Sequence, residues 1–335
     1  MSTTVYVPRD AAARALGADA VAEAIAREAK TRDLNVKIVR NGSRGMIWLE
    51  PLVEVETAEG RVAYGPVTDG DVTSLFKAKF LDGGDHALSL GQTEKIPFLK
   101  NQTRLTFARC GVIDPLSFED YQAHGGLEGL HKALDMQPAE IVASVTESGL
   151  RGRGGAGFPT GIKWKTVREA EGEQKTIVCN ADEGDSGTFA DRMIMEGDPF
   201  VLIEGMAIAG IATGATRGYI YLRSEYPDAI RTVNAAIDIA RDKGLLGDSV
   251  LGSKHTFDIE VRVGAGAYVC GEETSLLNSL EGKRGVVRAK PPLPALQGFM
   301  GRPTVVNNVI SLASVPVILA KGAEFYRDFG MGRSR

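Results

Sequence analysis

A run of sixteen residues, GLRGRGGAGFPTGIKW (149–164), contains six glycines and three basic side chains. The glycines around 154–157 can bring backbone N–H groups close to an anion, because no side chain stands in the way. Arg151, Arg153 and Lys163 add positive charge beside them. This combination favours a phosphate-bearing ligand over a purely structural turn.

The same run satisfies the pattern G-x-G-x-x-G through Gly152, Gly154 and Gly157. In a dinucleotide-binding fold that pattern follows a strand and opens a helix. Here the preceding segment 137–149 has helical spacing, and we expect 158–161 (FPTG) to interrupt any immediate helix. The sequence therefore indicates the ligand class but not the standard dinucleotide fold.

An acidic loop, CNADEGDSGTFADR (179–192), follows the strand-like apolar run TIV. Its side chains Asn180, Asp182, Glu183 and Asp185 come just after the carboxyl end of that strand, where open α/β sheets bind ligands. Asn and Asp are also common turn formers, and many acidic loops are simply solvated. This stretch alone leaves both interpretations open.

A third block, VGAGAYVCGEETSLLNSLEGKRG (263–285), places Glu272 and Glu273 in the first turn of a helix expected to begin near Gly271. The helix dipole alone would explain acidic residues there. The small residues before them would instead allow a flat ligand to approach closely. Tyr268 is either a wall of that site or an ordinary half-buried tyrosine.

A fourth block, AKPPLPALQGFMGRPTVVNNVIS (289–311), contains one lysine and two neighbouring asparagines. The two prolines after Lys290 restrict its backbone, which suits a charge that must point one way. Asn307 and Asn308 precede a helix-like apolar run, so either could be an N-cap.

Hydrolytic chemistry is disfavoured by what the sequence lacks. There is no Walker A loop, no H-E-x-x-H and no G-x-S-x-G. The histidines fall outside every glycine-rich block; they are His86, His124, His131 and His255. Cys110, Cys179 and Cys270 are far apart and form no C-x-x-C pair, so neither a disulfide framework nor a metal site is expected. The remaining possibility is redox chemistry carried out by a bound cofactor.

Charge and hydropathy limit the partners. The chain carries 39 Lys and Arg against 43 Asp and Glu, a formal net charge of −4, which gives no reason to expect nucleic acid. The first ten residues show no signal-peptide pattern, and the longest apolar run, 201–215, is too short and too interrupted to span a bilayer. We expect a soluble, cytoplasmic protein without membrane insertion.

Hydrophobic periodicity predicts an α/β protein with two parts. Residues 1–90 show the order strand, helix, three strands, helix, with Thr68 as an N-cap, which is compatible with a thioredoxin-like sheet. The strand-like runs after the first helix are 36–40, 45–57 and 61–65. Residues 91–135 have weak periodicity and read as a connector. From 136 to 312, strands alternate with helices, which indicates a layered α/β domain.

Taken in order, LRGRGGAGFPTGIKW, CNADE, GAYVCGEETSLLNSLEG and RPTVVNNV resemble the NADH-binding flavoprotein subunit (51 kDa-like) of respiratory complex I, NAD-reducing hydrogenases and NAD-dependent formate dehydrogenases. The likeness covers roughly residues 105–335. It implies a Rossmann-like FMN- and NAD-binding domain at 136–312, with no catalytic side chain and no metal ligand, because hydride transfer is carried by FMN.

The resemblance also implies the binding residues. Those expected around FMN are Gly152, Gly154, Gly155, Lys163, Asn180, Asp182, Glu183, Gly271, Glu272, Asn307 and Asn308. Those expected around NAD(H) are Phe158, Lys163, Asp185, Tyr268, Glu273 and Lys290.

The N-terminal part suggests the subfamily. VYVPRDAAARALGADAV, RNGSRGMIWLEPLVEVET and RVAYGPVT resemble the fused thioredoxin-like domain of formate dehydrogenase beta subunits. Relatives of that fold often hold a [2Fe–2S] cluster on four cysteines, but residues 1–90 contain no cysteine. We therefore expect a docking or structural role for this domain.

The sequence departs from the family at three places. Gly184, Asp185 and Ser186 stand where many complex I relatives have Ser-Glu-Pro, and Leu293 stands where many carry Phe, which puts adenine stacking there in doubt. Family members continue into a C-terminal domain whose C-x-x-C-x-x-C cysteines hold a [4Fe–4S] cluster. Residues 313–335 would be the start of that region, truncated before those cysteines.

The resemblance implies a diaphorase subunit that transfers hydride between NAD(H) and FMN and exchanges electrons with iron–sulfur clusters. Its expected partners are a thioredoxin-like [2Fe–2S] subunit and a molybdenum- or tungsten-bearing catalytic subunit of a formate dehydrogenase. Two alternatives are open: the equivalent subunit of an NAD-reducing hydrogenase or complex I, and a non-catalytic scaffold that lost its flavin.

Overall fold

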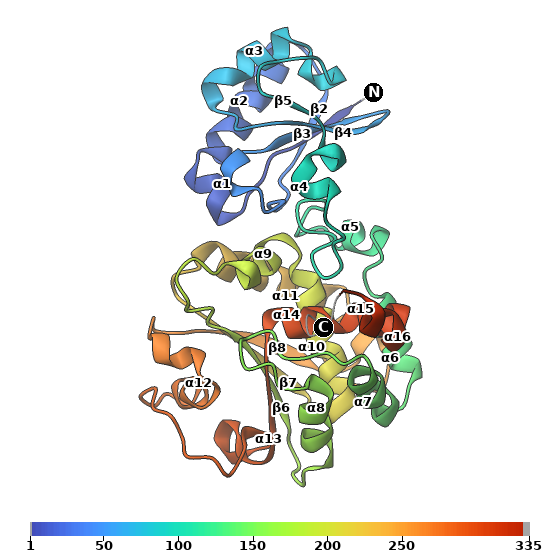
Figure 1. Ribbon diagram of the computed structural model, residues 1–335, viewed down its shortest axis with the longest axis vertical. Coiled ribbons are helices and arrows are strands. Elements are labelled where there is room, and N and C mark those ends of the chain that lie inside the picture. The colour runs from blue at the N-terminus through green and yellow to red at the C-terminus, as the bar shows by residue number, and fades with distance from the viewer. Residues whose placement is uncertain (1, 331–335) are drawn as a thin grey trace. The chain divides into compact units, whose positions relative to one another are not determined.

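The computed structural model describes residues 2–330, which form two compact units (Figure 1). The first, called here the N-terminal unit, runs to Ser117 and includes the short segment Glu196–Asp198. The second, called here the C-terminal unit, contains the rest of the chain from Phe118.

The N-terminal unit is built on a five-stranded sheet in the order β2-β1-β3-β4-β5, in which β1 and β2 are parallel and the other neighbours antiparallel. This is the thioredoxin-like arrangement expected from the sequence. Its elements are β1 (Thr3–Tyr6), α1 (Ala11–Ala15), α2 (Ala18–Thr31), β2 (Val36–Val39), η1 (Ile47–Leu49), β3 (Val53–Thr57), β4 (Gly60–Tyr64), η2 (Asp69–Asp71), α3 (Val72–Lys77), η3 (Phe80–Asp82), β5 (Ser89–Gln92), η4 (Thr93–Lys95) and α4 (Pro97–Lys100).

Two predictions for this unit need correction. The run 45–57 is not one strand: Ile47–Leu49 is a 3₁₀ turn, and β3 begins only at Val53. Pro51 lies between them and has no N–H to give to a ladder, so the extended stretch starts after it. The fifth strand, β5, was not predicted because LGQ lacks the alternating apolar pattern of a half-buried strand.

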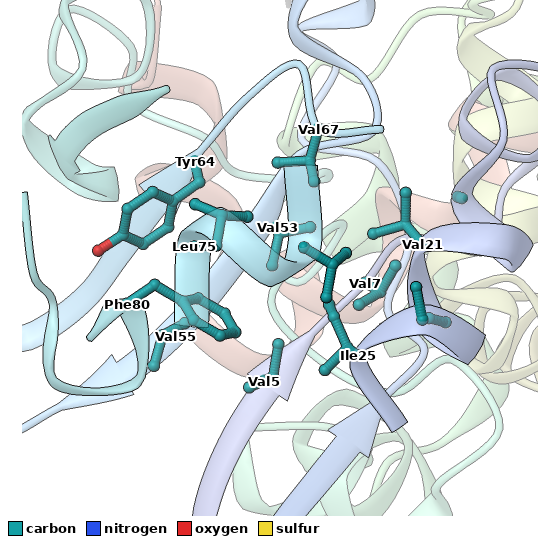
Figure 2. Close-up of a cluster of buried hydrophobic side chains, with 14 of the residues drawn as sticks. Val5, Val7, Val21, Ile25, Val53, Val55, Tyr64, Val67, Leu75 and Phe80 are labelled. Carbon is teal, nitrogen blue, oxygen red and sulfur yellow. The ribbon is translucent and has the colours of Figure 1, made fainter. Parts of the chain in front are cut away.

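The core of the N-terminal unit lies between its sheet and helices α2 and α3 (Figure 2). Val5 from β1 and Ile25 from α2 are fully buried there. The ring of Tyr64 packs edge-on against Phe80 at 5.8 Å between centroids. Thr68 is an N-cap as predicted, with a capping box to Asp71.

The C-terminal unit is built on a four-stranded parallel sheet in the order β8-β7-β6-β9 (Figure 1). Its elements are α5 (Phe118–Ala123), α6 (Glu128–Asp135), α7 (Pro138–Glu147), α8 (Thr160–Glu169), β6 (Thr176–Ala181), α9 (Ala190–Gly197), α10 (Pro199–Thr213), β7 (Arg217–Leu222), α11 (Pro227–Asp242), η5 (Val250–Gly252), β8 (Asp258–Val263), η6 (Tyr268–Gly271), α12 (Glu273–Leu280), α13 (Pro294–Gln297), η7 (Phe299–Gly301), β9 (Thr304–Asn308), α14 (Val309–Ala313), α15 (Val315–Lys321) and α16 (Ala323–Asp328).

Helix α10 is the centre of this unit. All its residues are buried, and it packs against β6 and against helices α6, α11 and α14. A helix that is apolar all round can only be stable in such a surrounded position. The apolar sequence of 198–215 predicts a buried helix, and the structure confirms it.

The strand order fixes where a ligand can bind. The chain builds β6, β7 and β8 in one direction and then returns to place β9 on the other side of β6. In an open parallel sheet the crevice at such a reversal, outside the carboxyl ends of the strands, is the usual binding site. Here those ends are Asn180 and Ala181 of β6 and Asn307 and Asn308 of β9.

Of the two predictions about the elements that flank the glycine run, one is confirmed and one is wrong. A helix, α7, precedes it as predicted, but α8 begins at Thr160 directly after it, so the expectation that 158–161 would interrupt a helix is wrong. Pro159 is the N-cap, a position whose N–H is not needed by the helix. No helix within residues 2–330 is long and apolar enough to cross a bilayer.

Candidate functional site

A pocket of about 450 Å³ opens at the carboxyl ends of β6 and β9, a volume in the range of sites for small molecules and cofactors. Residues from all four sequence blocks line it. They are Gly152, Gly154, Ala156, Gly157, Phe158, Lys163, Thr166, Asn180, Gly271, Glu272, Glu273, Lys290, Leu293, Pro294, Ala295, Thr304, Val306, Asn307 and Asn308.

The glycine run forms a closed loop at one side of the pocket. Two backbone hydrogen bonds close its neck, from the Gly152 N–H to the Phe158 carbonyl at 2.8 Å and from the Thr160 N–H to the Leu150 carbonyl at 2.9 Å. The N–H groups of 154–157 donate to no group within the described part of the chain. A row of N–H groups without partners, next to a helix N-terminus, is suited to a phosphate.

Gly154 has a steric reason to be glycine. A Cβ atom there would lie 3.2 Å from the Cβ of Asn308, closer than side chains normally approach. The N–H of the preceding Arg153 donates to Ser311 Oγ at 2.8 Å. The loop is therefore held against the turn that joins β9 to α14.

Helix α8 sends two neighbouring side chains to the end of β9. Lys163 Nζ donates to the Val306 carbonyl at 2.7 Å and lies 3.4 Å from a Glu273 oxygen. Trp164 is fully buried, and its indole N–H donates to Asn307 Oδ1 at 2.8 Å. One helix thus supplies both a positive charge and a fixed donor.

The asparagines at the strand ends are also bonded to neighbouring elements. Asn180 Nδ2 donates to the Gly271 carbonyl at 2.8 Å, which joins β6 to the turn before α12. Asn308 is the N-cap of α14 and accepts from the Ser311 N–H at 3.0 Å, while its Nδ2 donates to both oxygens of Asp191 at 2.9 Å. Of the two N-cap candidates considered from the sequence, Asn308 is the cap.

Two acids and one lysine form a charged wall. Glu272 is the N-cap of α12, and Glu273 is its first residue. Lys290 Nζ donates to Glu272 at 3.1 Å and to Glu273 at 2.8 Å. Burial alone would raise the pKa of the Glu272 carboxyl, but hydrogen bonds from Thr274, from the Ser275 N–H and from Lys290 hold it below its usual value. Glu272 is therefore ionised at neutral pH.

Five of the predicted site residues do not line the pocket; they are Gly155, Asp182, Glu183, Asp185 and Tyr268. Asp182 is buried, and burial raises its pKa to about 6 despite the charge of Arg223. Glu183 accepts from the Asp191 N–H at 2.7 Å, so it caps the first turn of α9. Tyr268 is 71% exposed and donates to Asp185 at 2.6 Å.

Several residues that line the pocket or support it were not predicted as site residues from the sequence. Leu293 was considered only as a missing aromatic, and the neighbouring Pro294 and Ala295 were not considered. Thr166 and Thr304 line the pocket without a sequence signal, since a threonine on a helix or strand is unremarkable. Ser311 and Asp191 could not be found because their bonds join distant segments.

The donor set fits a phosphate-bearing, flat cofactor. The loop N–H groups of 154–157 have no partner among the described residues, amides lie at the strand ends, and the apolar side chains of Phe158 and Leu293 are about half exposed beside them. All three cysteines are buried and unpaired, and no group of three or more His, Cys, Asp or Glu within residues 2–330 could hold a metal ion.

Comparison with known proteins also indicates a phosphate-bearing, flat cofactor. Residues 145–317 match the Complex1_51K family, described as the Nuo51 FMN-binding domain. The NADP-reducing hydrogenase subunit HndC of Solidesulfovibrio fructosivorans is 54% identical over 236 residues, which are 70% of this chain and 48% of that protein. A subunit of the NADH-quinone oxidoreductase of Rhizobium meliloti is 54% identical over 215 residues, 64% of this chain and 51% of that protein.

A solved structure is similar over both units. A chain in the crystal structure of an NAD⁺-reducing [NiFe]-hydrogenase in the H₂-reduced state matches 99% of this chain with a TM-score of 0.58 and 29% identity, and 55% of that chain is covered. This chain thus spans about half the length of the proteins it matches. The similarity supports the order of a thioredoxin-like part followed by a Rossmann-like part.

Proposed function

The chain belongs to the Nuo51 FMN-binding family, and from this premise we propose that it is an NAD(H)-dependent flavoprotein module that transfers hydride between NAD(H) and bound FMN. The single observation that carries the proposal is the pocket at the β6/β9 reversal, where eleven of the sixteen residues predicted for FMN and NAD(H) come together.

In this proposal, the residues of the chain bind FMN and NAD(H) and orient them relative to each other. The N–H groups of 154–157 and the charge of Lys163 hold the phosphate of FMN, and Asn307 at the end of β9 contacts its ring system. Glu273 and Lys290 lie on the NAD(H) side. FMN supplies the chemistry, since a flavin accepts hydride and passes single electrons on.

Phe158 and Leu293 have a covering role in the same proposal. Both are about half exposed at the pocket. A flat ligand lying against them would remove that surface from water and would exclude water from the reacting groups. Leu293 offers less stacking area than an aromatic residue would.

The assembly is a finer part of the proposal. The N-terminal motifs support the beta subunit of an NAD-dependent, cytoplasmic formate dehydrogenase, with a thioredoxin-like [2Fe–2S] subunit and a molybdenum or tungsten subunit as partners. The hydrogenase and quinone-oxidoreductase relatives named above favour the alternative, the equivalent subunit of a hydrogenase or complex I. A [4Fe–4S] cluster would belong to the family's C-terminal domain.

An anaerobic titration of the chain with FMN, followed by NADH, tests the proposed chemistry. We expect saturable quenching of flavin fluorescence and then bleaching of the bound flavin. Riboflavin is the matched ligand control, because it lacks the phosphate that the glycine loop is proposed to hold, and it should bind at least tenfold more weakly. A chain that melts cooperatively but takes up no FMN would instead be the scaffold considered above.

Affinity purification from the native host tests the assembly. A co-purifying subunit with bound molybdenum or tungsten would support the formate dehydrogenase context. A nickel-bearing subunit, or subunits of a quinone-reducing complex, would replace that context and leave the proposed hydride transfer intact.

A further inference from the structure

Asn307 and Asn308 are neighbours at the end of β9, but their amides are used differently. Both polar atoms of Asn308 are bonded within the chain, to Asp191 and to Ser311. Asn307 is 5% exposed and has one bonded atom, Oδ1, which accepts from Trp164. Its Nδ2 has no partner among the described residues, although the side chain belongs to the pocket lining.

The N–H₂ group of Asn307 is open to the pocket, where either water or a bound ligand can accept from it. The partner on the other side of the amide decides which group is left. An indole N–H is a donor only, so it bonds the oxygen of Asn307 and never the nitrogen. Trp164 is fully buried on α8 and cannot turn away. The amide is therefore held with its N–H₂ group away from the indole.

We propose that Trp164 is a positioning residue that fixes the amide of Asn307, so that Nδ2 donates a hydrogen bond to an acceptor on the bound ligand. This rests on the proposed function, in which the ligand is FMN, whose ring edge is rich in carbonyl oxygens and acceptor nitrogens. Asn308, with both its atoms used, builds the β9–α14 turn instead. The pair thus divides into a residue that recognises the ligand and a residue that shapes the loop.

The test is a double-mutant cycle on the full chain, measured as FMN affinity by flavin fluorescence. Trp164→Phe removes the N–H and keeps an aromatic ring, and Asn307→Ala removes the amide. We expect each single variant to bind FMN five- to twentyfold more weakly, and the double variant to bind no more weakly than the weaker single variant. Trp48→Phe is the matched control, since Trp48 is the other tryptophan and is 61% exposed; its FMN affinity should not change.

A purely structural role for Trp164 would give a different pattern. Its loss would then weaken FMN binding by the same factor with or without Asn307, so the two single effects would multiply. That result, or an unchanged affinity in Trp164→Phe, would overturn the positioning role.

Asn307→Asp keeps the test decisive if Trp164→Phe fails to fold. A carboxylate at this position still accepts from the indole, but it presents an acceptor instead of a donor to the pocket. We expect it to bind FMN more weakly than Asn307→Ala does; equal or tighter binding would overturn the proposal. A wild-type chain that binds no FMN would overturn the proposed function and, with it, the ligand assigned here.

Discussion

A buried acid of the first sheet and the polar groups at the pocket of the second sheet differ in how their hydrogen bonds are used. In the N-terminal unit, Glu54 is fully buried, and both its oxygens are bonded, to Arg44 at 3.1 Å and to Arg61 at 3.1 Å. In the C-terminal unit, the loop N–H groups of 154–157 and the amide nitrogen of Asn307 have no partner among the described residues. The loop residues 154–157 are exposed or half-buried, so the contrast is between a buried, fully paired carboxylate in the first sheet and unpaired donors around the pocket of the second.

The difference teaches where to look for a site. Buried polar groups that satisfy one another stabilise a particular packing and leave nothing for a ligand. Unsatisfied groups are tolerated where a ligand completes them. Substitutions in the first sheet should therefore change stability without changing ligand affinity, and substitutions at the ends of β6 and β9 should do the reverse.

The largest expected effect is on stability, from Glu54→Gln. The substitution leaves the buried guanidinium of Arg44 without its fully buried counter-charge, and breaking such a pair costs about 3–5 kcal/mol. Calorimetry should show a transition at lower temperature, while FMN affinity at about 20 °C should stay within about twofold.

Glu23→Gln is the matched control for Glu54→Gln. It removes an exposed ion pair with Arg27 and should leave the melting temperature unchanged. If FMN affinity falls together with stability in Glu54→Gln, the contrast between the two sheets does not hold.

The next effect is on affinity, from Gly154→Val. A Cβ atom at Gly154 would lie 3.2 Å from the Asn308 Cβ, and the added methyl groups would enter the loop that holds the phosphate. FMN should bind at least 100-fold more weakly by fluorescence titration, about 2.7 kcal/mol. Gly70→Val is the control, because its nearest neighbour is Thr68 Oγ1 at 3.7 Å. Normal flavin content in Gly154→Val would show that the glycine loop does not bind the phosphate of FMN.

Much of this contrast could be predicted from the sequence, and its limits have physical causes. The continuous apolar run at 198–215 identified α10, the helical spacing of apolar residues at 227–244 identified α11, and turn chemistry identified the cap at Thr68. Strand β9 was missed because TVVNN is short and leads straight into α14, so it reads as the approach to a helix. Helix α8 was missed at its start because Pro159 was taken as a breaker when it is a cap.

For the site, the sequence identified side chains but not their bonds. The four blocks were found because glycine, proline and acidic residues cluster in them. The bonds that decide each role join residues more than 100 positions apart, as for Trp164 with Asn307 and Asp191 with Asn308. Such pairs depend on how α8, α9 and β9 pack, and no local pattern encodes that.

Asp191 gives a smaller effect that depends on pH. Burial and the neighbouring charge of Glu183 raise the pKa of Asp191 to about 8, while in the unfolded chain it titrates near its ordinary value of about 4. Between these values the folded state holds the proton that the unfolded state has lost. The free energy of unfolding therefore falls as the pH rises from about 4 to about 8.

Asp191→Asn should remove this dependence. The substituted amide keeps an oxygen that can accept from Asn308, so the turn has a partner at every pH. Urea unfolding at about pH 5 and about pH 8.5 should show that the wild type loses on the order of 2 kcal/mol more than the variant does. Asp182 and Glu50, whose pKa values burial raises to about 6 and about 7, contribute equally to both proteins. Parallel pH profiles would show that Asp191 is not the group responsible.

Glu273 is the sharpest test of the comparison, because it is a paired residue inside the pocket. Its two oxygens lie 2.8 Å from Lys290 and 3.4 Å from Lys163, so by pairing alone it resembles Glu54 of the first sheet. It differs in burial: its side chain is 27% exposed, so an incoming ligand can take over its bonds.

Glu273→Gln should therefore reduce the rate of flavin reduction by NADH about tenfold, near 1.4 kcal/mol, with FMN affinity within about threefold. Stopped-flow reduction at several NADH concentrations measures this, with Glu260→Gln, an exposed acid paired with Arg262, as control. Unchanged reduction kinetics would mean that Glu273 only stabilises the first turn of α12. An acid paired within the chain would then take no part in ligand binding in either unit.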